Sequence, residues 1–130
     1  MYCERLAPEL VKSCDSLWPK IYEKPGGKYL KAVKSHLFSH AIHFNMNPSL
    51  GHQDKRSLWS GMDIIAVGGK YEGGLLRFAQ LGCAFPSRPG DLFFIRGAGL
   101  YHQGTEWNQG GRMVYSFFAD KNAFHKSKVH

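Results

Sequence analysis

The chain has 130 residues, enough for one hydrophobic core and too few for two, so the sequence predicts a single domain over residues 1–130. Hydrophobic residues make up 43% of the chain and aromatic residues 14%, and this composition excludes an intrinsically disordered protein. A formal net charge of +7 makes the surface attractive to polyanions, and nucleic acid, anionic lipid and carboxylate ligands all qualify as partners.

The cysteines and the hydropathy of the chain indicate in which cellular compartment the protein is expected. Cys3, Cys14 and Cys83 are an odd number with no CxxC pair, which argues against a disulfide framework and against a structural zinc site. The N-terminus has no apolar run typical of a signal peptide, and no segment is apolar for long enough to span a membrane. We therefore expect a soluble, intracellular protein, cytoplasmic or nuclear, with no membrane partner.

The first element predicted along the chain is a helix over residues 4–22. Leu10, Cys14 and Leu17 recur at spacings of three and four residues and belong to one apolar stripe. Such a stripe predicts that the helix packs on the outside of a sheet.

Two prolines mark this helix. Pro8 suits the first helical turn, where its missing N–H costs nothing, whereas Pro19 is expected to end or kink the helix. A second, short helix is predicted within residues 29–38, so residues 1–40 form a helical N-terminal part.

The rest of the chain alternates short apolar runs with turn signals. The fifteen glycines and six prolines of the chain favour many tight turns and therefore β structure. About seven or eight short strands are expected, among them residues 41–46, 63–67, 75–79, 83–85, 91–96, 99–107 and 112–119. Gly68-Gly69 is expected to close the second strand, and residues 108–111 are expected to form a turn.

The spacing of the strands predicts a mainly β fold, a sandwich or barrel of the jelly-roll kind, over residues 41–120. Residues 121–130 are polar and basic, and this tail is expected to fray from residue 120 onward.

The sequence His52-Gln53-Asp54 is the strongest candidate for chemistry. Residues i and i+2 of an extended strand point to the same face, so an imidazole and a carboxylate can aim at one point. His102, on a late strand, can supply a third ligand where the chain folds back. Two histidines and one carboxylate form the facial triad of non-haem Fe(II) oxygenases, but a His-x-Asp pair alone is weak evidence.

An ordered set of motifs strengthens this interpretation: His52-x-Asp54, Gly73-Gly74-Leu75, Pro89-Gly90-Asp91-Leu92-Phe93-Phe94, His102 and Gly111-Arg112. Together they resemble the double-stranded β-helix of Fe(II)/2-oxoglutarate-dependent dioxygenases, most of all the TET/JBP-like oxygenase domains of mushroom-forming fungi. The resemblance covers residues 41–120. The shortness of the N-terminal part departs from this family, in which that part buttresses the barrel and shapes the substrate pocket.

The resemblance implies roles for particular residues. His52, Asp54 and His102 are expected to bind Fe(II), with the remaining positions taken by 2-oxoglutarate and O₂. Arg112 is expected to hold the far carboxylate of 2-oxoglutarate, a task that suits the fork of a guanidinium. Asn45 is expected to line the cofactor pocket. The implied reaction is hydroxylation of a C–H bond, coupled to the conversion of 2-oxoglutarate to succinate and CO₂.

The substrate class is predicted from the resemblance and the net charge together. The resemblance and the basic charge together favour a methylated nucleobase in DNA or RNA. Two alternatives stay open: a non-catalytic jelly-roll module that binds nucleic acid or glycan, and a cupin-like metalloprotein with another metal and another reaction.

Other polar and aromatic residues near the motifs have simpler explanations. Asp91 and Asp63 are interpreted as turn or strand-edge residues and not as ligands. Trp59, Tyr101 and Trp107 flank the expected site, where they could stack a planar substrate or pack in the core.

Overall fold

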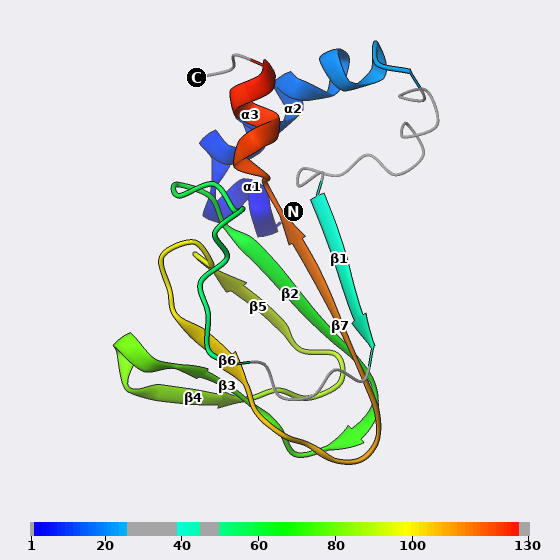
Figure 1. Ribbon diagram of the computed structural model, residues 1–130, viewed down its shortest axis with the longest axis vertical. Coiled ribbons are helices and arrows are strands. Elements are labelled where there is room, and N and C mark those ends of the chain that lie inside the picture. Colours follow the sequence, from blue (N-terminus) through cyan, green and yellow to red (C-terminus); the bar gives the residue numbers. More distant parts are fainter. Residues whose placement is uncertain (1, 26–38, 45–49, 128–130) are drawn as a thin grey trace.

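The computed structural model describes residues 2–25, 39–44 and 50–127, and it confirms a mainly β, jelly-roll fold (Figure 1). The strands of the described residues are β1 (Ser39–Phe44), β2 (Asp63–Glu72), β3 (Leu75–Phe78), β4 (Cys83–Pro86), β5 (Leu92–Ile95), β6 (His102–Gly104) and β7 (Asn108–Phe118). Every pairing between them is antiparallel.

The strands form two sheets. The larger has the order β1-β7-β2-β5 and the smaller the order β4-β3-β6. An isolated bridge between His52 and His102 adds the segment before β2 to the edge of the smaller sheet at β6. From β2 onward the chain passes between the two sheets at the steps β2 to β3, β4 to β5, β5 to β6 and β6 to β7, whereas β3 and β4 are paired neighbours within the smaller sheet.

The core lies between the two sheets. Alternate residues of β2, starting at Asp63 and continuing through Ile65 and Val67, are buried, while the residues between them are partly exposed. This period of two is what a strand with one buried face requires. On the facing sheet, Leu76 and Phe78 of β3 belong to the same buried cluster as Ile65 and Val67.

The glycines of β2 and β7 do not end these strands, and both expectations about them are wrong. β2 continues through Gly68 and Gly69 to Glu72, and β7 already begins at Asn108. A Cβ on Gly69 would collide with the carbonyl oxygen of Gly111, and both Gly69 and Gly110 have positive φ. The glycines therefore allow two paired backbones to approach closely, a use of glycine that a turn signal does not distinguish from a chain break.

Two helices, α1 (Tyr2–Leu6) and α2 (Pro8–Tyr22), stand where a single helix over residues 4–22 was expected. The buried face of α2 packs on the outside of the larger sheet, as predicted, in a cluster that includes Ile64 of β2 and Phe117 of β7. Pro8 is the first residue of α2, as expected, and the helix continues past Pro19. None of the described helices is long and apolar enough to cross a membrane. The short helix expected within residues 29–38 lies outside the described residues.

The expectation of a frayed C-terminal tail is wrong for residues 121–127, which form helix α3 (Lys121–Ser127). Asp120 caps it, because its Oδ1 accepts a hydrogen bond from the N–H of Asn122 at 2.8 Å. Phe124 is only 6% exposed and belongs to the cluster formed by Leu10, Cys14 and Leu17 of α2. Figure 1 shows α2 and α3 together at one end of the sheets.

Candidate metal centre

The loop that carries His52 and Asp54 is fixed by its backbone. His52 N–H donates to the carbonyl of His102 at 3.0 Å, and His102 N–H returns a bond to the carbonyl of His52 at 2.9 Å. Asp54 N–H donates to the carbonyl of Gly97 at 2.8 Å. Backbone pairing therefore brings an early loop beside the start of β6, and the three predicted ligands meet without long side chains having to reach.

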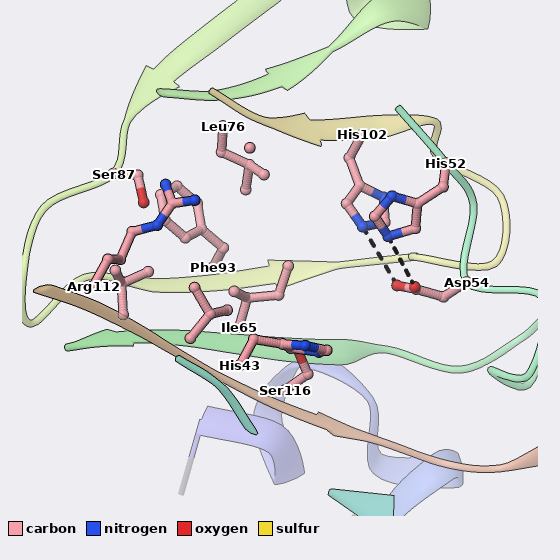
Figure 2. Close-up of a pocket in the computed structure, with 13 residues that line it drawn as sticks. His43, His52, Asp54, Ile65, Leu76, Ser87, Phe93, His102, Arg112 and Ser116 are labelled. Atoms are coloured by element: carbon pink, nitrogen blue, oxygen red, sulfur yellow. Dashed lines mark ion pairs between the residues drawn. The ribbon is translucent and has the colours of Figure 1, made fainter. Parts of the chain in front are cut away.

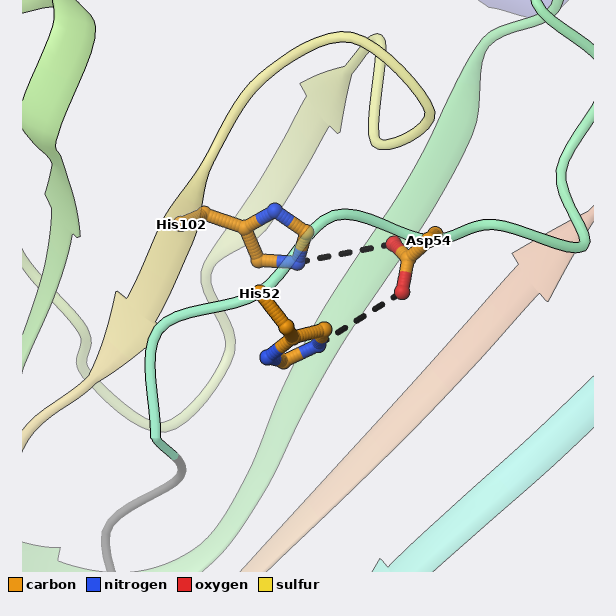
Figure 3. Close-up of side chains that lie close together, drawn as sticks. All are labelled: His52, Asp54 and His102. Atoms are coloured by element: carbon orange, nitrogen blue, oxygen red, sulfur yellow. Dashed lines mark ion pairs between the residues drawn. The ribbon is translucent and has the colours of Figure 1, made fainter.

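The three side chains converge on one point (Figure 3). Asp54 Oδ1 lies 3.5 Å from His52 Nε2, and Asp54 Oδ2 lies 3.4 Å from His102 Nε2. One ligand atom from each residue lies within 4.8 Å of the others. The side chain of His102 is 6% exposed, whereas that of His52 is 47% exposed, so the group is buried on one side and open on the other.

Hydrogen bonds set the tautomers of both imidazoles. His52 Nδ1 lies 2.9 Å from the carbonyl oxygen of Leu50, and His102 Nδ1 lies 2.8 Å from the carbonyl oxygen of Leu100. A carbonyl oxygen only accepts, so each Nδ1 carries the proton, and in a neutral ring Nε2 then presents a lone pair. Both lone pairs face the carboxylate of Asp54. A cation between them would replace this repulsion with attraction.

The donor set fits a divalent metal ion. Imidazole nitrogen and carboxylate oxygen bind such ions at about 2.0–2.2 Å, so neighbouring ligands at right angles lie about 3 Å apart. The observed separations of 3.5 and 3.4 Å, one to each oxygen of Asp54, exceed this by a few tenths of an ångström, and all three ligand atoms lie within 4.8 Å of one another. The Nδ1 bonds to backbone carbonyls are the orienting contacts that metal-binding histidines usually make.

A pocket of about 290 Å³ opens beside the three side chains (Figure 2). Besides the three candidate ligands it is lined by His43, Ile65, Val67, Leu76, Ser87, Phe93, Gly104, Arg112, Val114 and Ser116. Figure 2 shows the candidate ligands at one end of the pocket and Arg112 with Ser87 at the other. The walls between the two ends are mostly apolar.

Arg112 projects from β7 and is 8% exposed. Its Nη1 donates to the carbonyl of Thr105 at 3.2 Å, and its guanidinium carbon lies 4.2 Å from the centre of the Trp107 ring. Burial lowers the pKa of the guanidinium, and the neighbouring phenol of Tyr71 opposes this shift. An anionic group that entered the pocket would be attracted to a charge that water screens poorly.

Tyr71 lies beside Arg112 and is a residue that the sequence analysis missed. Its hydroxyl donates to the carbonyl of Ser87 at 2.6 Å, and burial is the main cause that raises its pKa. Tyr71 continues the alternation of buried residues on β2, but the expected end of that strand at Val67 concealed this position. Continuing the period of two from Val67 past the exposed Gly69 reaches Tyr71, and this period was the signal that could have found it.

Asp63 is the first residue of β2, in line with its interpretation as a turn or strand-edge residue, but it is also buried beside Asp54, which was not expected. Burial, partly opposed by a hydrogen bond from Ser57 and reinforced by the charge of Asp54, raises the pKa of Asp63 from 3.8 to about 7. Its Oδ2 is buried and has no hydrogen-bond partner among the described residues. Nothing in the local sequence distinguishes it from an acidic residue at a turn.

The sequence analysis also named Asn45, Asp91, Trp59 and Trp107 as residues near the expected site. Asn45 lies outside the described residues. Asp91 is a turn residue, as expected, because its Oδ2 accepts a hydrogen bond from the N–H of Arg88 at 2.7 Å. Trp107 stacks on Arg112, while the side chain of Trp59 is 73% exposed.

Among solved structures, that of NgTET1 in complex with 5mC DNA is similar to this chain, with a TM-score of 0.61 and 19% sequence identity. The match covers 74% of this chain and 42% of NgTET1, so the chain spans about two-fifths of the length of that protein. A cupin-2 domain protein from Shewanella frigidimarina is a more distant match, with a TM-score of 0.40 and 10% identity, covering 74% of this chain and 95% of that protein. No protein-family model and no curated protein matches the sequence. The chain thus has an oxygenase-like jelly-roll fold that carries a possible His-Asp-His metal site.

Proposed function

We propose that the protein is an Fe(II)- and 2-oxoglutarate-dependent dioxygenase that hydroxylates a C–H bond. One observation carries the proposal: the Nε2 atoms of two imidazoles face one carboxylate at one end of a pocket, and a buried guanidinium lies at the other end. The first group suits a divalent metal ion and the second suits a carboxylate, and an apolar pocket joins them. An Fe(II) ion with a dicarboxylate as co-substrate needs both.

Each residue has a task in this proposal. His52, Asp54 and His102 would hold iron, and a set of three protein ligands would leave coordination positions for the co-substrate and O₂. Arg112 pairs with the distal carboxylate of 2-oxoglutarate, and the Trp107 ring orients its guanidinium. The apolar walls, among them Val67, Leu76 and Val114, exclude water from the co-substrate.

The proposed reaction consumes O₂, 2-oxoglutarate and a substrate C–H bond, and it yields succinate, CO₂ and the hydroxylated substrate. Iron, when bound, supplies the activation of O₂ and the oxidative decarboxylation of 2-oxoglutarate. One oxygen atom of O₂ enters the new carboxylate of succinate, CO₂ leaves, and the other oxygen atom converts a substrate C–H bond to C–OH.

Succinate formation tests the proposal. Purified protein with Fe(II), ascorbate and 2-oxoglutarate is expected to form succinate slowly without a substrate, and His52→Ala is expected to abolish both iron binding and succinate. Arg112→Ala is expected to weaken 2-oxoglutarate binding by at least about tenfold, because a hydrogen bond to a charged group contributes about 1.5–3 kcal/mol. It should leave iron stoichiometry unchanged, because Arg112 lies at the far end of the pocket.

Two results would contradict the proposal. The wild-type protein, loaded with Fe(II), could neither bind 2-oxoglutarate nor form succinate. Alternatively, Arg112→Ala could bind 2-oxoglutarate as tightly as the wild type, which would remove Arg112 from the site.

For the substrate we propose a methylated base in DNA or RNA. The net charge of +7 supports a polyanionic partner, and NgTET1, which has a similar fold, was solved in complex with 5mC DNA. A base must leave the duplex or be single-stranded to reach such a pocket. A single-stranded oligonucleotide with one 5-methylcytosine should therefore stimulate succinate formation more than its unmethylated counterpart, and high salt should reduce the difference.

A further inference from the structure

A second pocket, of about 260 Å³, adjoins the first on the far side of Asp54. The two pockets share His43, Asp54, Ile65 and Ser116 in their walls. Arg112 and both candidate histidine ligands line only the first pocket, whereas the remaining walls of the second are Ala41, Gln53, Lys55, Arg56, Ser57, Asp63 and Phe118. Two compartments thus meet at the candidate carboxylate ligand.

The deep wall of the second pocket contains an unsatisfied polar atom. Asp63 is 4% exposed, and its Oδ2 has no hydrogen-bond partner among the described residues, whereas its carboxyl group also hydrogen-bonds to Ser57 and to the backbone of Gly97. A buried polar atom without a partner costs about 1–3 kcal/mol. Ser57, also 4% exposed, hydrogen-bonds to the Asp63 carboxyl and holds it in place. A ligand group that hydrogen-bonds to Asp63 would remove this cost.

The mouth of the second pocket carries a cation. The side chain of Lys55 is exposed and forms no ion pair with any described residue. Its neighbour Arg56 is already engaged, because its Nε donates to Asp120 Oδ2 at 2.9 Å and its Nη2 contacts the same oxygen. Lys55 is therefore the cation at this mouth that is available to an anionic ligand.

The walls between Asp63 and Lys55 include apolar side chains. Ala41 lies on β1 and Phe118 at the end of β7, and Ile65 of β2 separates this pocket from the first. A small flat group fits between such walls better than a flexible charged chain, because it makes apolar contacts on its faces and keeps its polar edge for one partner.

We infer that the second pocket is the substrate compartment of the proposed dioxygenase, with a hydrogen-bonding edge of the substrate against Asp63 and an anionic part of the substrate at Lys55. The inference rests on the proposed function, which assigns the first pocket to 2-oxoglutarate. The C–H bond to be oxidised then reaches the metal past Asp54, and the co-substrate reaches it from the side of Arg112. Substrate and co-substrate do not compete for space.

Two neighbouring residues of β1 provide a matched pair for the test. Ala41 lines the second pocket, and Ile42 is the next residue of the strand, 43% exposed, and lines neither pocket. Successive residues of a strand point to opposite faces. Ala41→Trp therefore fills the second pocket, while Ile42→Trp places the same side chain on the opposite face of the sheet.

The probes are 5-methyl-2′-deoxycytidine 5′-monophosphate and its nucleoside, each titrated into the protein of residues 1–130 loaded with Fe(II) and 2-oxoglutarate under anaerobic conditions. The monophosphate carries both an amino edge and an anion. We expect Ala41→Trp to weaken its binding by at least about tenfold and Ile42→Trp by less than about twofold, since overpacking a filled site typically costs 1–3 kcal/mol. Lys55→Ala should weaken binding of the monophosphate but not of the nucleoside, and the affinity for 2-oxoglutarate should not change in any of these variants.

Three outcomes overturn the inference while leaving the proposed function intact. The monophosphate could compete with 2-oxoglutarate, it could bind Ala41→Trp as well as the wild type, or wild-type protein that binds 2-oxoglutarate could bind neither probe. If Ala41→Trp loses 2-oxoglutarate binding because it fails to fold, Phe118→Trp fills the same pocket from β7 and decides the question by the same criteria. Loss of 2-oxoglutarate binding by the wild type would instead contradict the proposed function.

Discussion

The acidic side chains of Asp54 and Asp63 lie so close to Gly97 that this position has no room for a side chain. A Cβ at this position would collide with Asp63 Oδ2 and with Asp54 Oδ2. The carbonyl of Gly97 also accepts the hydrogen bond from Asp54 N–H. Gly97 thus fixes both the backbone and the carboxylate of a candidate ligand without contacting the metal itself.

We expect Gly97→Ala to weaken metal binding by roughly 10–100-fold, the usual effect of disturbing the groups that orient a ligand. The methyl group would push the Asp54 carboxylate away from the two imidazoles. Gly99→Ala is the control in the same loop, because the nearest atom to a Cβ there belongs to the Trp59 ring at 3.6 Å, an ordinary contact. Titration with Co(II), followed by its absorption spectrum, measures both variants; equal affinities would show that Gly97 does not position Asp54.

Asp63 makes the stability of the metal-free protein depend on pH. Its pKa is about 7 in the folded protein, mainly because of burial, and 3.8 is its ordinary value. Between these two values the unfolded chain has released the proton while the folded chain keeps it, so the folded state binds more protons. Stability therefore falls as pH rises from about 4 to 7, and the penalty stays constant above that.

Asp63→Asn removes this ionisation and keeps the side chain's shape and its capacity to accept a hydrogen bond from Ser57. We expect the variant to gain stability over the wild type as pH rises from 5 to 8, by at most about 2.6 kcal/mol, because only the part of the pKa shift between pH 5 and about 7 falls in this range. Urea denaturation in the presence of a chelator at several pH values measures the difference. A difference that does not vary with pH would show that Asp63 does not titrate in this range.

At the scale of secondary structure, α3 shows what a composition-based interpretation overlooks. Residues 121–130 are rich in lysine and histidine, and this composition is typical of a solvated tail. The structural information is carried by two positions, the cap at Asp120 and the single aromatic residue Phe124. A helix this short has no periodic stripe to recognise, so its stability depends on a partner, α2, that lies about a hundred residues away in the sequence.

Phe124→Ala tests whether α3 is part of the core. It is expected to destabilise the protein by about 3–5 kcal/mol, the usual cost of deleting a buried phenylalanine side chain. His125→Ala, at the neighbouring exposed position, should change stability by less than about 0.5 kcal/mol. Thermal or urea unfolding of the two variants compares them directly, and equal stabilities would mean that the helix does not pack on α2.

At the scale of the whole molecule, the sequence predicted those features that local patterns encode. The spacing of the strands and the order of the motifs predicted a jelly roll, and the structure brings His52, Asp54 and His102 together. The sequence analysis did not foresee the surroundings of Asp63 and Tyr71, because these arise only when strands from different parts of the chain pack together. In the structure, Asp63 is buried near Asp54, and Tyr71 lies beside Arg112. Short sequence motifs can thus identify the candidate ligands, whereas the residues that surround them are identified only from the packed structure.

The candidate metal centre joins parts of the chain that are otherwise held by few contacts. His52 and Asp54 lie on a loop whose backbone bonds to β6 and to Gly97 are a short bridge, not a full strand pairing. A metal ion that binds His52, Asp54 and His102 would tie this loop to the smaller sheet. Because an ion of this kind binds the folded chain more tightly than the unfolded chain, it must also stabilise the whole molecule.

We therefore expect Co(II), used because it is less prone to oxidation than Fe(II), to stabilise the protein by about 2.7 kcal/mol at a free concentration one hundred times its dissociation constant. His102→Ala should lose this stabilisation, since the triad would keep only two ligands. His125→Ala, which removes a histidine from the exposed face of α3, should retain it. Thermal unfolding of tag-free protein with and without the metal measures the effect, and a stabilisation of His102→Ala equal to that of the wild type would place the ion elsewhere in the chain.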